Sequence, residues 1–122
     1  MGETIVNKKI FCFDINNDTW QIEEKCKDEL LELYKKECKE DDIYMVYGVT
    51  KKSKQIIYIN SAMSEQQKRK TLMHELMHCY LYEFGIHNFS SFDEEDLCNF
   101  SAHSHDIIHK IVKDYYTYKF IE

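Results

Sequence analysis

Residues 64–85 constrain the fold more than any other segment, because they carry signals for both ends of a single helix. Ser64 stands three residues before Gln67, which is the spacing of a capping box at a helix N-terminus. Gly85 can adopt the left-handed conformation that commonly ends a helix. The segment therefore predicts one well-defined helix that begins after Ser64 and runs to about Phe84.

The middle of this predicted helix carries the motif HELMH at residues 74–78. Side chains four residues apart project from the same helix face, so the imidazoles of His74 and His78 can reach one metal ion. Glu75 is rotated by about 100° from His74 and can take a proton from a metal-bound water without ligating the ion. Catalytic zinc sites combine such ligands with a third protein ligand and one water.

The neighbours of HELMH argue against an ordinary pair of solvated histidines. Most of them are apolar, namely Leu72, Met73, Leu76, Met77, Cys79, Tyr80 and Leu81. They leave little polar helix face for two histidines, and a buried imidazole without a partner is costly. A metal ion satisfies both rings, so we expect a metal site here.

We expect a third ligand from the next helix. A second capping-box pattern, Ser91-Phe-Asp-Glu94, predicts where this helix begins. Glu94 and Glu95 are both candidates for a site of two histidines and one glutamate. Glu95 is favoured, because the capping box occupies Glu94. Asn99 follows Glu95 by four residues on the same face and can orient a ligating histidine through its other ring nitrogen.

The oxyanion that develops during hydrolysis also needs a hydrogen-bond donor or a positive charge. His103 and Tyr80 are candidates for this role as transition-state donors. The pair His105 and His109 has no glutamate in the H-E-x-x-H position, and we interpret it as part of a polar helix face.

The remaining segments predict a small α+β domain around the HELMH helix. We expect a strand at residues 10–15, an amphipathic helix at residues 21–39, a hairpin of strands at residues 43–50 and 55–60, and a last helix from residue 91 onward. The apolar stripe of the last helix consists of Leu97, Phe100, Ser104, Ile107, Ile108, Ile111 and Tyr115. These elements predict one domain over residues 1–122, with a small, mostly antiparallel sheet of about three strands packed on three helices.

The composition argues against several classes of function. The formal net charge of -6 disfavours nucleic-acid binding, which needs a clustered positive surface. The sequence has neither a signal peptide nor an apolar run of roughly 18 residues, so we expect no membrane partner. The five cysteines form no C-x-x-C pair, and we interpret them as reduced thiols of a cytoplasmic protein.

The order of a strand, the HELMH helix and a helix that contains EDLCN at residues 95–99 resembles the ImmA/IrrE-type metallopeptidases, especially the small ones of phages and mobile elements in low-GC bacteria. The resemblance covers about residues 55–112. It implies a zincin-like fold of the gluzincin type, with one zinc ion held by His74, His78 and Glu95. It also implies that Glu75 is the general base and that Asn99 supports a ligand.

The same resemblance implies an endopeptidase whose protein or peptide substrate is a helix-turn-helix repressor of a phage or mobile element. The segment AHSHDII at residues 102–108 differs from the L-L-M-P-like segment of larger members, and we expect no attached DNA-binding or sensory domain. A catalytically silent regulatory or binding module that contains a metal is therefore the alternative function. Two histidines and a carboxylate also suit manganese or iron.

A peptide substrate of such enzymes commonly lies extended along the edge strand beside the active helix. The segment that leads into the HELMH helix is the candidate for this edge strand, and it consists of Gln55, Ile56, Ile57, Tyr58, Ile59 and Asn60.

Overall fold

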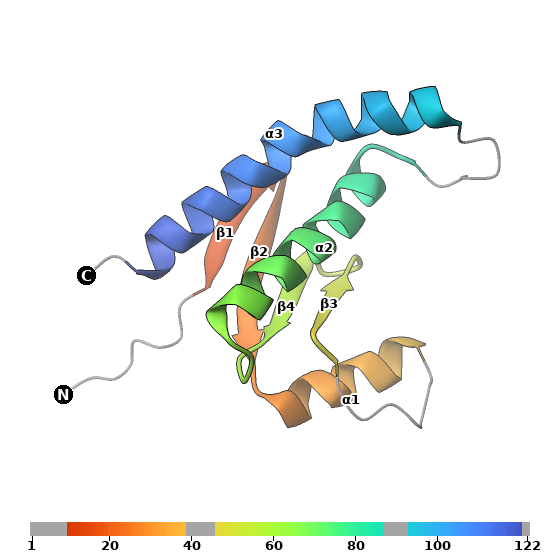
Figure 1. Cartoon of the computed structure of the whole chain (residues 1–122). Coiled ribbons are helices and arrows are strands. Elements are labelled where there is room, and N and C mark those ends of the chain that lie inside the picture. The colour runs from red at the N-terminus through yellow and green to blue at the C-terminus, as the bar shows by residue number, and fades with distance from the viewer. Residues whose placement is uncertain (1–9, 39–45, 87–92, 121–122) are drawn as a thin grey trace.

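A four-stranded mixed sheet and three helices make up the fold (Figure 1). The computed structural model describes residues 10–38, 46–86 and 93–120. Its elements are, in chain order, β1 (Phe11–Ile15), β2 (Asp18–Lys25), α1 (Lys27–Cys38), β3 (Gly48–Lys51), β4 (Ile56–Asn60), α2 (Glu65–Glu83) and α3 (Glu94–Lys119). The strand order is β1-β2-β4-β3, with β2 parallel to β4 and the other neighbours antiparallel. The predicted α+β class with three helices is confirmed.

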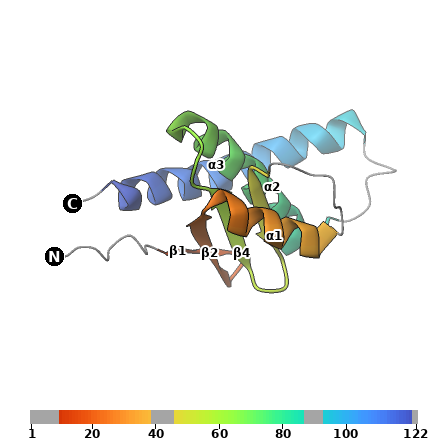
Figure 2. The ribbon, with the colours of Figure 1, turned by 90° about the horizontal axis from the view of Figure 1, so that it is seen from below.

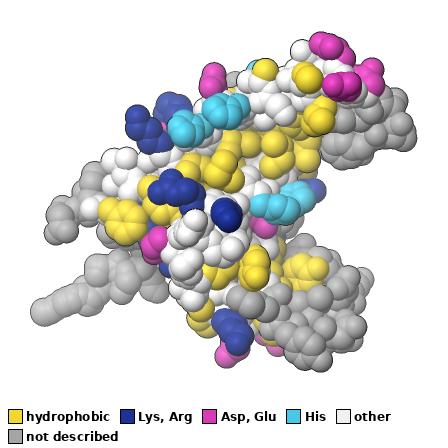
Figure 3. Space-filling model, in the orientation of Figure 1, with side chains coloured by type: hydrophobic (Ala, Val, Ile, Leu, Met, Phe, Trp, Pro, Cys, Tyr) yellow, Lys and Arg dark blue, Asp and Glu magenta, His cyan; other side chains and the backbone are white. Residues whose placement is uncertain are grey.

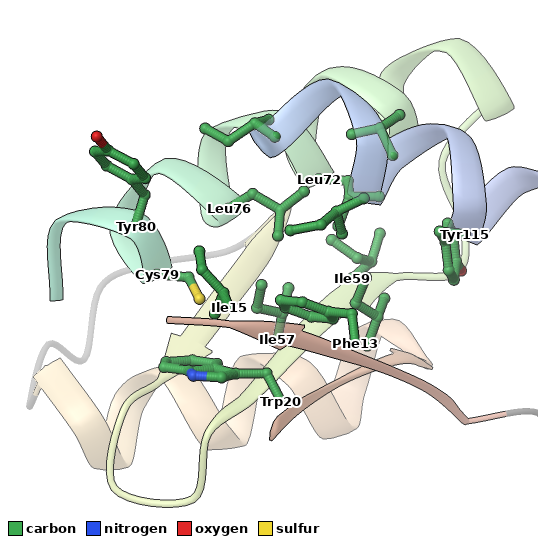
Figure 4. Close-up of a cluster of buried hydrophobic side chains, with 14 of the residues drawn as sticks. Phe13, Ile15, Trp20, Ile57, Ile59, Leu72, Leu76, Cys79, Tyr80 and Tyr115 are labelled. Carbon is green, nitrogen blue, oxygen red and sulfur yellow. The ribbon is translucent and has the colours of Figure 1, made fainter. Parts of the chain in front are cut away.

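The sheet separates two hydrophobic cores, because successive strand residues point to opposite faces. Ile57 and Ile59 face α2 and α3, whereas Tyr58 faces Leu30 of α1. Figure 4 shows the larger core, whose labelled members are Phe13, Ile15, Trp20, Ile57, Ile59, Leu72, Leu76, Cys79, Tyr80 and Tyr115. Helix α1 therefore covers one face of β3 and β4, and α2 and α3 cover the other face of the sheet (Figure 2).

The predicted helix at residues 21–39 is wrong in its first part. Residues Asp18–Lys25 form β2, and α1 begins only at Lys27. Trp20 and Ile22 are both fully buried in the larger core, which is the period of two that a strand requires. Pairing with β1 on one side and β4 on the other outweighs the helical spacing of the apolar residues. The sheet consequently has four strands, one more than expected.

Two hairpins connect the strands, and the second of them is the one that the sequence predicts. Asn16 and Asn17 have φ values of 51° and 67° and join β1 to β2 as a two-residue hairpin loop. Strands β3 and β4 form the second hairpin, in which Gln55 ends the turn with a φ of 56°.

The prediction that residues 55–60 form a sheet edge is wrong. Strand β4 is hydrogen-bonded to β2 on one side and to β3 on the other, so it is an interior strand. Gln55 precedes the strand as a turn residue. The physical reason is that β2, which the sequence pattern did not reveal, fills the position beside β4. The open edges of the described sheet are β1 and β3.

Helix α2 has the predicted ends. The Ser64 side chain accepts a hydrogen bond from the Gln67 amide at 3.1 Å, although the Gln67 side chain does not reach back. Gly85 has a φ of +70°, and the amide of Ile86 donates to the Leu81 carbonyl at 2.9 Å. This is the bond that closes a Schellman motif. Among the described residues, no helix is long and apolar enough to cross a membrane.

Helix α3 begins differently from the prediction. Asp93 is the N-cap, and it forms a reciprocal capping box with Asp96. Ser91 lies outside the described residues, and Glu94 is the first residue of the helix. Glu94 therefore has no capping role, and the capping argument that favoured Glu95 over Glu94 no longer holds. The predicted apolar stripe is correct from Phe100 onward.

An ion-pair network joins β2 to the first turn of α2 and to the last turn of α3. Glu24 accepts a hydrogen bond from Lys68 at 3.0 Å and one from the Tyr115 hydroxyl at 3.2 Å. Lys119 pairs with both Glu24 and Glu65. Burial raises the pKa of Glu24, but hydrogen bonds and charge attraction from the two lysines outweigh it and hold the pKa below its ordinary value of 4.5.

We predict that Glu24→Gln lowers the free energy of unfolding by about 2 kcal/mol at neutral pH, because the carboxylate accepts charged hydrogen bonds in a half-buried place. A pKa that is lower in the folded state stabilises the protein above the unfolded value and ceases to do so as the pH falls through the folded value. The difference from wild type should therefore begin to shrink as the pH falls through 4.5 and vanish once the pH is below the lower, folded-state pKa of Glu24. Urea denaturation at several pH values measures this difference in the free energy of unfolding. Glu23→Gln is the control, since Glu23 pairs with the neighbouring Lys25, and equal losses in both variants would contradict the prediction.

Candidate metal centre

Helix α2 places the two histidines of HELMH next to each other on its surface. The ring centroids of His74 and His78 are 5.0 Å apart, and the rings are inclined by 74°. Both side chains are exposed, so the expectation that apolar neighbours would leave little polar face is wrong. Leu72, Leu76 and Cys79 point into the larger core instead. The pair is therefore open to an ion from solvent.

Glu75 lies between the helix and strand β3, where it is only 7% exposed. Its Oε1 accepts a hydrogen bond from the Thr50 hydroxyl at 2.6 Å. The same hydroxyl lies 3.2 Å from the backbone carbonyl oxygen of Glu75. The carboxylate is thus held on the side of the helix that faces the open edge of the sheet.

Gly48 allows strand β3 to lie this close to α2. A Cβ atom at this position would stand 2.8 Å from Thr71 Cγ2 and 3.1 Å from Glu75 Cγ. It would also stand 3.1 Å from the Tyr58 carbonyl oxygen, which belongs to backbone. The contact is one that only glycine makes without displacing its neighbours. A glycine inside a β-rich run is the sequence signal that could have indicated this contact.

A cavity of about 570 Å³ opens beside the motif, between α1, β3 and α2. It is lined by Tyr34, Val46, Tyr47, Gly48, Gln67, Lys70, Thr71, His74 and Glu75. One histidine of the pair and the buried carboxylate thus share a single cavity, which can accommodate part of a peptide chain.

Glu95 and Asn99 lie on the first two turns of α3, where both side chains are exposed. Figure 3 shows acidic side chains at this end of α3 well apart from the histidines on α2. Among the residues that the structure describes, no three His, Cys, Asp or Glu side chains are close enough to hold a metal ion together. The structure therefore places His74 next to His78 and lets His74 share a cavity with Glu75, and it leaves Glu95 apart. The paired imidazoles fit two positions of a zinc site.

Tyr80 and His103 contact each other. The Tyr80 hydroxyl is hydrogen-bonded to Nδ1 of His103, and the Tyr80 ring packs against Phe84 and Phe100. Tyr80 is rotated by about 200° from His78 along the helix, so its hydroxyl points to α3 and away from the histidine pair. Burial raises the pKa of Tyr80. These contacts give Tyr80 a role in joining the two helices.

His105 and His109 form a second, exposed pair on α3, with ring centroids 5.7 Å apart and nearly parallel planes. Figure 3 shows histidine side chains at separate places over α3 and α2. They lie on a solvated helix face.

The family model of the IrrE N-terminal-like domain, a peptidase family, matches residues 26–107, which is about two thirds of the chain. The chain belongs to this family. The matched segment of this IrrE N-terminal-like domain begins just before α1 and includes the HELMH motif and Glu95. The resemblance to ImmA/IrrE-type metallopeptidases is thereby confirmed, and membership indicates a metallopeptidase-like function. Searches of curated proteins and of solved structures gave no match.

We predict that Gly48→Ala lowers the free energy of unfolding of this IrrE N-terminal-like domain by about 1–3 kcal/mol, because the new methyl group overpacks the β3–α2 contact. Adding Thr71→Ser removes the nearest clashing atom, Cγ2. The double variant should therefore recover part of the loss. Urea denaturation of the four proteins in this cycle, wild type included, measures the coupling. If the losses of stability in the two single variants simply add up in the double variant, Gly48 and Thr71 do not influence each other, and the prediction is wrong.

Proposed function

We propose that this chain is a zinc-dependent endopeptidase of the gluzincin type. The observation that carries the proposal is the buried carboxylate of Glu75 beside the exposed pair His74 and His78, with a cavity at Glu75 and His74. On this single helix, the two histidines can bind the metal ion, while the carboxylate of Glu75 stays apart from them and can accept a proton. The peptidase family to which the chain belongs supports the assignment.

His74 and His78 would hold the ion through their imidazoles, and Glu95 would supply the third ligand from the start of α3. Bound zinc supplies an acidified water and polarises the carbonyl of the scissile bond. Asn99, four residues after Glu95, would orient one of the ligands. Glu95 remains the proposed ligand because it begins the EDLCN segment at residues 95–99.

Glu75 performs the proton transfers in this proposal. Its carboxylate accepts a proton from the attacking water and passes it to the leaving amine. Its place between α2 and β3 puts it beside the sheet edge that we propose for the substrate.

We propose β3 as the strand along which a peptide substrate lies. The Asn60 amide donates to the Tyr47 carbonyl, and residues of an antiparallel pair alternate between bonded and non-bonded positions. Gly48 and Thr50 therefore direct their backbone groups away from β4, toward the open edge of the described sheet. A peptide could add to this edge as a further strand.

The proposed substrate is a protein, and the resemblance to ImmA/IrrE-type peptidases suggests a repressor of a phage or mobile element. The separation of Glu95 from the histidine pair favours a second candidate function, a binding module without catalysis. Metal content and turnover decide between the two.

We predict about one zinc ion per chain in protein purified without a metal-binding tag, measured by plasma mass spectrometry. His74→Ala, His78→Ala and Glu95→Gln should each lose most of the zinc, because a three-ligand site does not hold the ion tightly with two. Glu94→Gln should keep it.

His105→Ala is the matched control, since it removes a histidine from the other exposed pair. Zinc loss in this control would mean that the ion is bound at the pair on α3 and would contradict the proposed site. No zinc in the wild type, even after zinc is added, would argue for the binding module.

We predict that Glu75→Gln keeps the zinc but lowers turnover of a quenched-fluorescent peptide mixture by at least about 100-fold, because the amide cannot accept the proton.

The inactive Glu75→Gln variant also retains uncleaved peptide, which allows a test of the substrate strand. Hydrogen exchange should then slow at the Gly48 and Thr50 amides when peptide is added. Unchanged turnover would exclude Glu75 as the base, and unchanged exchange would exclude β3 as the substrate strand.

A further inference from the structure

We infer that Thr50 is a positioning residue that holds the general base Glu75 in its working orientation. The inference rests on the proposed function of Glu75 and adds a residue outside the HELMH motif. Thr50 lies on β3, 25 positions before Glu75, and no sequence pattern connects the two.

The hydrogen bond from Thr50 distinguishes the two oxygens of the Glu75 carboxylate. A hydroxyl carries one proton, and the short contact of 2.6 Å to Oε1 identifies the carboxylate as its main acceptor. The contact of 3.2 Å to the Glu75 carbonyl oxygen is the weaker one. Oε1 is thus engaged by the protein.

We assign proton transfer to the second oxygen, Oε2. Glu75 lines the cavity next to His74, so its side chain borders the space in which a bound water and a substrate carbonyl would lie. One oxygen is held by the Thr50 hydroxyl, and the other is the one that would accept the proton.

The position of Thr50 is itself rigid. Its backbone is opposite Ile57 in the β3–β4 ladder, and its branched side chain restricts rotation about χ1. A Cβ added at Gly48, on the same strand, would stand 3.1 Å from Cγ of Glu75, so the strand passes close to the stem of this side chain. The carboxylate is therefore held at its end by Thr50, and strand β3 limits the space beside its stem. Displacing a reacting group by about 1 Å commonly costs about 100-fold in rate.

Two substitutions distinguish the effect of the Thr50 hydroxyl from the effect of the side-chain shape. Thr50→Val replaces the hydroxyl with a methyl group of similar size, whereas Thr50→Ser keeps the hydroxyl and loses the methyl group. Thr19→Val is the matched control, because Thr19 donates a similar hydrogen bond of 2.8 Å to Asp14 in the hairpin of β1 and β2. All variants are made in the full chain and loaded with zinc.

Kinetics are measured on one quenched-fluorescent peptide that the wild type cleaves. We expect Thr50→Val to lower kcat by about 10- to 100-fold with KM within about twofold of the wild type. Thr50→Ser should stay within about threefold, Thr19→Val should match the wild type, and all should keep their zinc. A purely structural role would instead lower thermal stability and leave kcat of the folded enzyme unchanged. Equal losses of kcat in the valine and serine variants would overturn the inference.

Crystal structures of the zinc-free variants provide a readout that does not depend on activity. The Glu75 carboxylate should leave its place beside β3 in Thr50→Val and keep it in Thr50→Ser. A carboxylate that stays in the wild-type position in Thr50→Val would refute the inference. If the wild type and Glu75→Gln are equally inactive on every peptide, the proposed function fails, whereas these structures still decide the role of Thr50.

Discussion

The close approach of strand β3 to helix α2 is the contact on which the candidate site depends. At Gly48 the strand backbone comes near enough that the stem of Glu75 fills the space of a side chain. The apolar residues on the opposite side of α2 pack on Ile57 and Ile59, so the helix cannot move away without opening the larger core. The orientation of the carboxylate is thus fixed by core packing.

The parts of the fold that depend on local chemistry were predictable from the sequence. The ends of α2 follow from Ser64 and Gly85, and the turn after β1 suits two consecutive asparagines that accept positive φ values. The neighbouring positions of His74 and His78 follow from helix geometry alone. Each of these features involves residues within a few positions of one another.

The parts that depend on distant partners were not predictable in this way. The apolar residues from position 21 onward have the spacing of a helix. Residues 21–25 nevertheless pair with β4, more than 30 residues later, and form part of the sheet. That pairing also makes β4 interior and leaves β3 as the edge beside α2. The contact between Thr50 and Glu75 depends on the same arrangement, and no local pattern in the sequence indicates it. The position of Glu95, the proposed third ligand, likewise depends on how α3 begins, which its capping residues alone do not determine.

The parallel pairing of β2 with β4 affects which fragment of this chain can fold on its own and stay monomeric. The segment common to the family begins at residue 26, whereas Trp20 and Ile22, both fully buried, come before it. A fragment trimmed to the shared segment would lose this strand and expose the backbone of β4 along its whole length. Such a bare, apolar edge is a template for association between molecules. The first hairpin therefore protects the solubility of the sheet as well as completing its core.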